Sequence, residues 1–165
     1  MAFVVSLGLI FPFQSAQAVT DDGTVDATIV SASTPALNPT DELNFGEIIS
    51  GPAGTVVVDT AGTPTPTGVS LVPSSGVQQG VIQVIGTPLA VVNINMVAPS
   101  YTVSNGVQTM NVTGFDIGNG AGNPHAVTIG AGATVDVNIG GTLNVGAGQA
   151  TGNYTGTFTL NADYQ

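Results

Sequence analysis

Apolar side chains in this chain come in short alternating runs separated by glycine and proline, and the clearest run is the last. From Tyr154 to Tyr164 the even-numbered positions read Tyr, Gly, Phe, Leu, Ala and Tyr, whereas the positions between them are Thr, Asn or Asp. Successive side chains of a strand point to opposite faces, so the pattern predicts a strand with one apolar and one polar face. Because chain ends fray unless a sheet holds them, we expect a partner along the whole length of this strand.

The rest of the chain repeats the pattern and indicates an all-β protein. No segment has the period and caps of a helix. About nine or ten short strands separated by turns favour a single Greek-key β-sandwich of immunoglobulin-like type. Alternation predicts that the following side chains face the core: Leu43, Phe45, Val56, Val58, Val92, Ile94, Met96, Val135, Val137 and Ile139, together with the aromatic Phe115.

Stretches rich in glycine and proline predict the connections. Asn105-Gly106 suits a type I′ turn and makes Tyr101–Met110 a hairpin. Gly140-Gly141 predicts a turn between two strands. The prolines of Ala61–Gly68 predict a loop or an edge excursion, because proline cannot donate to a sheet ladder. Pro35–Asp41, which contains two prolines, is expected to be a linker.

The charge of the chain excludes several kinds of partner. It has no Lys, no Arg and no Cys, and ten acidic residues give it a net charge of −10. Nothing is available to neutralise phosphates, so we expect neither nucleic acid nor an anionic membrane surface to bind. Disulfides and thiolate chemistry are excluded as well. Copies of the chain repel one another, so close assembly would favour salt or divalent cations.

The first residues have the pattern of an export signal. Residues 1–18 are apolar and end in Ala16-Gln17-Ala18, a small-x-small cleavage site before Val19. The basic region that normally precedes such a segment is missing, which indicates a start codon placed too late. The alternative is an uncleaved apolar arm. We expect residues 19–34 to form an N-terminal arm and residues 35–165 the β-sandwich, in a protein exported by a bacterium to the cell surface and free of the membrane after cleavage.

No set of residues indicates catalysis, and we expect no enzyme and no cofactor. His125 is the only histidine, follows Asn123-Pro124 and is expected to be an exposed loop residue. One histidine without cysteine supplies too few ligands for zinc. The acidic residues of the N-terminal third leave Ca²⁺ as a minor hypothesis, but the Asp-x-Asp-x-Asp-Gly pattern of a calcium loop is absent, and a solvated acidic surface is favoured.

Sugar chemistry has equally little support. Paired carboxylates are compatible with a glycosidase, but the chain has no Trp and only three Tyr to stack on sugar rings. Asn111 and Asn153 each begin an Asn-x-Thr sequence, which we interpret as incidental in an exported bacterial protein. A lectin-like sandwich that binds a glycan stays an alternative without a motif behind it.

The end of the chain resembles known exported proteins. Tyr164 is the penultimate residue, Gly152 is fourteenth from the end, and an alternating strand lies between them. This arrangement resembles the C-terminal signature of chaperone–usher pilins. The run Leu143–Phe158 is similar to the ending of spore-coat-U-like archaic pilins and of an exported bacterial family described only as a domain of unknown function. That second family also carries an early Leu-x-Phe-Gly-x-Ile, like Leu43–Ile48.

The resemblance implies a sandwich that lacks one strand and is completed by an extended segment of the next subunit. In such pilins the added strand binds through main-chain hydrogen bonds, and its alternate side chains enter pockets. The donor strand would present Val25, Ala27 and Ile29. The acceptor groove would be bordered by Tyr154, Phe158, Leu160, Ala162 and Tyr164, with Gly152 as the signature glycine.

The resemblance therefore predicts a homopolymer, a subunit of an extracellular filament or surface coat, served by a periplasmic chaperone and an usher. The arm departs from the pilin pattern because Ala27 is small and Asp21, Asp22 and Asp26 are acidic. It could equally fold back into its own domain. The alternative is then a self-complemented, monomeric secreted binding module for a glycan or Ca²⁺.

Overall fold

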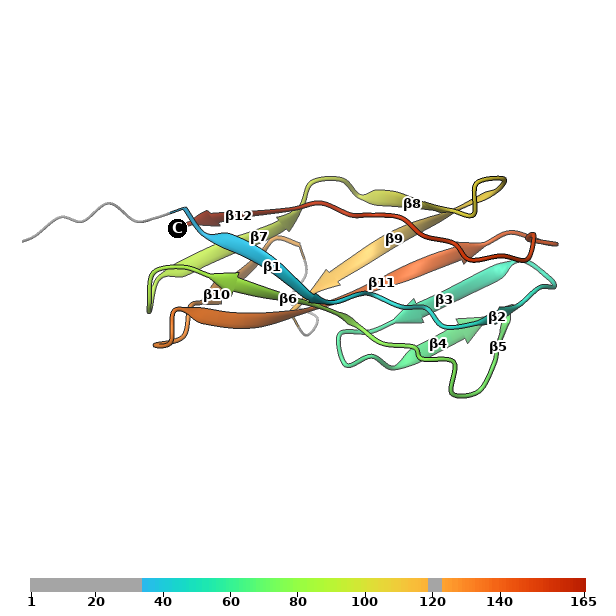
Figure 1. The fold of residues 1–165 in the computed structure, drawn as a ribbon, viewed down its shortest axis with the longest axis horizontal. Helices are drawn as coiled ribbons and strands as arrows, with labels where there is room; N and C mark the ends of the chain where they lie inside the picture. The colour runs from blue at the N-terminus through green and yellow to red at the C-terminus, as the bar shows by residue number, and fades with distance from the viewer. Residues whose placement is uncertain (1–33, 119–122) are drawn as a thin grey trace, which may run out of the picture. The chain divides into compact units, whose positions relative to one another are not determined.

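The computed structural model describes residues 34–118 and 123–165, and these form an all-β sandwich without any helix (Figure 1). The export segment and the arm with Val25, Ala27 and Ile29 lie outside the described residues. No helix in the described ranges is long and apolar enough to cross a membrane. The predicted fold class is confirmed.

The described residues contain twelve strands, of which β2 and β5 are only two residues long. They are β1 (Ala36–Asp41), β2 (Ile48–Ile49), β3 (Gly54–Val58), β4 (Pro64–Thr67), β5 (Ser70–Leu71), β6 (Gly80–Ile85), β7 (Val91–Met96), β8 (Ser100–Ser104), β9 (Thr109–Ile117), β10 (His125–Thr128), β11 (Thr134–Val145) and β12 (Leu160–Tyr164).

The long strand β11 organises the seven-stranded sheet. Ile139 pairs with Gly80 of β6 and also with Ile117 of β9, so these two strands lie on opposite edges of β11. Thr142 pairs in the same way with β3 and β9. The edge opposite β9 therefore carries β6 along its first half and β3 along its second half. Outside these strands lie β1 next to β6, β4 next to β3 and β8 next to β9.

The predicted turn at Gly140-Gly141 is wrong, because β11 runs without a break from Thr134 to Val145. The two glycines lie where the neighbouring strand changes from β6 to β3. A Cβ on Gly140 would lie 2.6 Å from the carbonyl oxygen of Val58, so only glycine allows this backbone approach. The pairing of β11 with β9 shifts register between Gly140 and Thr142. The glycine pair thus marks a close approach and a bulge within one strand.

The predicted hairpin is present as β8 and β9, but its type I′ turn is wrong. The last cross-strand pair is Ser104 with Thr109, which leaves Asn105–Gln108 as the loop. Type I′ needs positive φ at both central residues, and here Gly106 has φ +86° while Asn105 is not among the residues with positive φ. The Asn105 side chain instead accepts hydrogen bonds from the amides of Val107 and Gln108, at 2.9 and 2.8 Å. This side-chain capping favours the longer loop.

The proline-rich stretches both form edge strands. The expected edge excursion within Ala61–Gly68 is β4, which pairs only with β3 among the strands described. The expected linker Pro35–Asp41 is wrong, because residues 36–41 form β1 and pair with β6. An edge strand tolerates Pro39, and Leu37 packs against the core, so a stretch that looks like a spacer becomes the border of the sheet.

A second sheet, in the order β10-β7-β12, covers one half of the large sheet. Between them lies the main core, built around Val84, Val92, Ile94, Ile117 and Ile139. A second core of Met110, Val112, Leu143 and Val145 lies under the other half of β9 and β11. Of the predicted inward residues, those of β3 and β7 are buried, as are Val137 and Ile139, whereas Val135 is half-buried. Phe115 is half-buried and packs against both cores.

Candidate strand-acceptor site

The last segment of the chain divides between the two sheets. Residues Leu160–Tyr164 form β12 and pair with β7, from Leu160 opposite Met96 to Tyr164 opposite Val92. Upstream, Thr155 exchanges two backbone hydrogen bonds with Ser104 of β8, at 3.0 and 2.8 Å. The prediction of one unbroken strand from Tyr154 to Tyr164 is therefore wrong. The chain passes from the edge of the large sheet to the edge of the small one.

Gly156 and Gly152 allow this crossing. A Cβ on Gly156 would collide with the carbonyl oxygen of Thr102, so the segment can lie this close to β8 only without a side chain there. Gly152 has φ +149°, a conformation that L-residues rarely adopt, and lies against Asn105 at the tip of the β8–β9 hairpin. The signature glycine thus positions the start of the last segment against the hairpin.

Aromatic side chains attach the segment to the cores. Phe158 lies 5.6 Å from Phe115 and 6.4 Å from Tyr101, measured between ring centroids. The Tyr101 hydroxyl donates to the carbonyl of Thr159 at 2.8 Å. The Tyr164 hydroxyl accepts a hydrogen bond from the backbone N–H of Thr87 at 2.7 Å. The apolar side of the segment is therefore held inward, as the alternation predicted.

The hydroxyl of Tyr154 holds the beginning of the segment by hydrogen bonds in the same way. It donates to the carbonyl of Ala150 at 2.8 Å and accepts from the side chain of Gln149 at 3.0 Å. Its ring packs against the second core, whereas Phe158, Leu160, Ala162 and Tyr164 pack against the main core. The structure thus brings all five residues of the predicted acceptor strand onto one side of the sandwich.

The two segments at the ends of the described chain lie at the periphery of the cores, and their own apolar residues are only half-buried. Every buried residue lies between positions 56 and 145, and none lies in 34–55 or 146–165. Leu37, Phe45 and Ile48 approach the cores from one border and are half-buried. The apolar residues of the last segment approach from the other border and are half-buried too. We call the side of the sandwich between residues 36–48 and 152–164 the seam.

The seam is bordered by two sheet edges. Among the described strands, β1 pairs only with β6 and β12 only with β7. The end of β12 lies near the start of β1, since Tyr164 contacts Gly86 and Thr87 and the preceding Ile85 pairs with Ala36. The two strands run in opposite directions along the seam (Figure 1). Backbone amides and carbonyls on such edges are the groups that an added strand binds.

The other candidate residues gain no chemical role. The prediction of an exposed loop histidine is wrong: His125 belongs to β10, pairs with Ile94, is half-buried and packs its ring against Gly118. The short spacing after Pro124 misled the prediction, since the strand begins at the histidine itself. No group of three or more His, Cys, Asp or Glu side chains that could hold a metal ion occurs in the described ranges.

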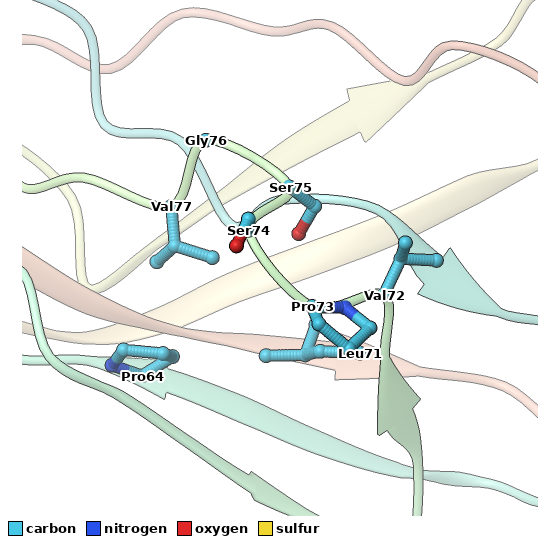
Figure 2. Close-up of a pocket in the computed structure, with 8 residues that line it drawn as sticks. All are labelled: Pro64, Leu71, Val72, Pro73, Ser74, Ser75, Gly76 and Val77. Carbon is cyan, nitrogen blue, oxygen red and sulfur yellow. The ribbon is translucent and has the colours of Figure 1, made fainter.

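One shallow pocket lies beside residues 46–48 at one border of the seam. It measures about 460 Å³ and is lined by Pro64 and by residues 71–77 of the loop after β5 (Figure 2). Its lining is mostly apolar, and none of its residues belongs to β1, β12 or the last segment. The polar side chains of its lining are those of Ser74 and Ser75, and the buried hydroxyl of Ser75 lies against Gly46 without a hydrogen-bond partner among the described residues.

The fold and the seam define a class of protein, an all-β sandwich whose first and last described segments border one side with half-buried apolar residues. Within that class, the family model of DUF4402, described as a domain of unknown function, matches residues 36–164, and the chain belongs to this family. The match extends from the first residue of β1 to the last residue of β12. Neither a curated protein nor a solved structure matches the chain significantly.

Proposed function

We propose that the protein is a structural subunit of an extracellular bacterial filament or surface coat, joined by donor-strand exchange. The observation that carries the proposal is the seam, where two sheet edges border cores whose outer apolar side chains are only half-buried. An extended peptide laid there would pair its backbone with an edge and cover those side chains at the same time.

The N-terminal arm has the length and the pattern for this role. Extended residues 19–31 reach about 40 Å, at about 3.3 Å per residue, whereas β12 is only five residues long. Val25, Ala27 and Ile29 alternate with polar residues, so one face of the arm would meet the seam and the other would stay in water. In the sequence the arm is followed directly by β1, which borders the seam.

Strand direction separates donation from self-complementation. An arm that turned back at residues 32–35 would run antiparallel to β1 and therefore parallel to β12. An arm from a neighbour is free of that tether and can run antiparallel to β12, in which case it would run parallel to β1. The direction in which the arm pairs with β12 therefore distinguishes donation from self-complementation.

Export to the cell surface, a periplasmic chaperone and an usher belong to the same proposal. An uncovered seam exposes apolar side chains and unpaired backbone groups, which makes an unassembled subunit prone to aggregation. A chaperone that covers the seam until assembly would remove that hazard. The proposal requires no cofactor and no catalytic step.

Engineered cysteines test the proposal directly, because the chain has none of its own. We expect the double variant Ala27→Cys/Ala162→Cys, exported and oxidised, to form disulfide-linked ladders on a non-reducing gel, since the two side chains share the apolar side of the paired strands. The matched control Ala27→Cys/Asn161→Cys places the second thiol on the polar face and should not link.

A single intramolecular disulfide in a monomer would overturn the proposal. That outcome would show the arm folded back into its own domain and would leave the self-complemented binding module for a glycan or Ca²⁺. The absence of either disulfide would place the arm away from β12 and also contradict donor-strand exchange there.

A further inference from the structure

In the half of the large sheet formed by β8, β9, the second half of β11, β3 and β4, the outward face carries an array of hydroxyl and amide side chains without any charge. One row of cross-strand partners passes through all five strands of this half of the sheet: Thr102, Asn111, Asn144, Thr55 and Thr67. The row two residues further along consists of Ser100, Thr113, Thr142, Val57 and Thr65. We call these two rows the hydroxyl–amide face.

These residues point away from the core because their neighbours in sequence point into it. Met110 and Val112 flank Asn111, and Leu143 and Val145 flank Asn144, and all four flanking side chains are buried. Thr102, Asn111, Asn144, Thr65 and Thr67 are exposed. The face is therefore a solvent-accessible surface.

The face is neutral on a strongly acidic molecule. None of the acidic residues among the described positions belongs to either row. The carboxylates closest in the pairing scheme lie at its border: Asp116 pairs with Gly140, and Asp59 follows the end of β3. For a chain with a net charge of −10 and no Lys or Arg, this is a surface on which two copies meet little repulsion.

The side chains are already ordered by hydrogen bonds to one another. The Asn144 amide donates to the Thr113 hydroxyl at 3.0 Å and to the Asn111 carbonyl at 3.1 Å, and Thr102 donates to the Asn111 side chain at 3.3 Å. Groups fixed in this way lose less conformational entropy when a partner binds.

We propose that the hydroxyl–amide face is the surface through which neighbouring filaments of this same protein associate laterally, an inference that rests on the proposed function. A second copy is the occupant that fits, because a two-fold related face presents rows at the same strand spacing of about 4.8 Å. A neutral glycan fits less well, since no aromatic side chain belongs to either row to stack on a sugar ring.

Each contact is weak, because neutral hydrogen bonds exchanged with water contribute little. Association becomes effective when many subunits are held in one filament and their faces act together. Salt strengthens it by screening the repulsion between the acidic remainders of the subunits. Donor-strand exchange at the seam would then join subunits into a filament, and the hydroxyl–amide face would hold neighbouring filaments together.

The test uses the full exported chain and two matched double variants. Thr65→Asp/Thr67→Asp places two charges on the face, and Thr128→Asp/Thr134→Asp places two charges on exposed strand positions elsewhere. Bundling is measured by electron microscopy and sedimentation at low and high salt, and a denaturing gel of the same samples reports the strand-joined ladders.

We expect wild-type filaments to bundle more at high salt, the face variant to bundle about tenfold less, and the control to behave as wild type. Ser100→Asp/Thr102→Asp, at the other border of the face, should reproduce the loss. Circular dichroism checks that each variant is folded.

Single wild-type filaments at every salt concentration would overturn the inference, as would an equal loss of bundling in the face and control variants. Bundling that a soluble neutral polysaccharide competes away, with the same variant sensitivity, would identify a glycan as the occupant instead. In the wild type, ladders without bundling would overturn only this inference, whereas missing ladders would overturn the proposed function.

Discussion

The edge strands β4 and β12 differ in the backbone donors that they offer to an approaching strand. In β4, Pro64 and Pro66 pair with Val58 and Val56, so the N–H positions that remain for hydrogen bonds to β3 are those of the intervening threonines. The residues of β4 whose backbone groups point away from β3, within the plane of the sheet, are the two prolines, and proline has no N–H. An approaching strand therefore finds no donor there.

The edge at β12 has no such protection. Residues 160–164 contain no proline, their apolar side chains are half-buried, and the strand borders the seam. One edge strand of the molecule thus lacks outward N–H donors, whereas the other contains no proline, and the two differ in how well a further strand could pair with them. This difference supports a specific strand-addition site at the seam better than either edge does alone.

Removal of the arm is the change with the largest expected effect. Deleting residues 19–31 should abolish SDS-resistant ladders and leave unstable, unassembled subunits, because nothing would then cover the seam. The measurements are gel electrophoresis of the exported protein and its thermal unfolding. A deletion variant that stays a stable monomer, with wild-type ladders absent from the start, would contradict the comparison of the two edges.

Restoring donors to β4 should break its protection. In Pro64→Val/Pro66→Val the outward positions regain an N–H, and valine favours a strand, so we expect edge-to-edge aggregation at concentrations where the wild type stays soluble. Light scattering measures the effect. The control Thr65→Val/Thr67→Val adds the same apolar residues without new outward donors. Equal aggregation of the two variants would show that hydrophobicity, and not the missing donors, protects this edge.

Loss of the Phe158 ring should loosen the border at the last segment. Phe158→Ala removes contacts with Tyr101 and Phe115, and because the side chain is half-buried we expect a loss of about 2–3 kcal/mol in the free energy of unfolding. Denaturant unfolding measures it. Val107→Ala, at a side chain that is 87% exposed, should change the stability by less than about 0.5 kcal/mol. Similar values for the two variants would exclude Phe158 as an anchor.

The smallest effect is expected at the end of β12. Tyr164→Phe removes the hydroxyl that accepts from the Thr87 amide and should cost about 1 kcal/mol. Thr87→Ala keeps that amide and removes only the 3.3 Å contact with the threonine hydroxyl, so its loss should be smaller. Amide hydrogen exchange at Thr87, faster in Tyr164→Phe than in Thr87→Ala, locates the change. The reverse order would mean that the threonine side chain holds the strand.

Alternation was enough to predict the inward residues of β3 and β7 and the apolar side of the last segment. The period of two in a strand is a local property, and burial of one face follows from it directly. The prolines within 61–68 were enough to predict either a loop or an edge, because proline has no N–H to donate in any sheet, and the structure shows the edge. The motifs near the two ends of the chain were enough to predict a resemblance to a family described only as a domain of unknown function.

Tertiary contacts decided the remaining features. Gly140-Gly141 has the composition of a turn, and only the neighbouring Val58 backbone explains why it lies inside a strand. Asn105 takes the longer loop because its side chain caps it. Pro35–Asp41 has too few apolar residues to indicate β1, which is ordered by its pairing with β6.

The sequence by itself determined that the chain forms β-strands and which residues of β3, β7, the first half of β11 and the last segment face inward. It also determined that the molecule is acidic and has no Lys or Arg. Those properties depend on each residue and its close neighbours. Only the tertiary structure decided that β1 and β12 border the same seam and that the threonines and asparagines of five strands align in rows. Such placements depend on pairings between residues far apart in the chain, and a local pattern carries no record of them.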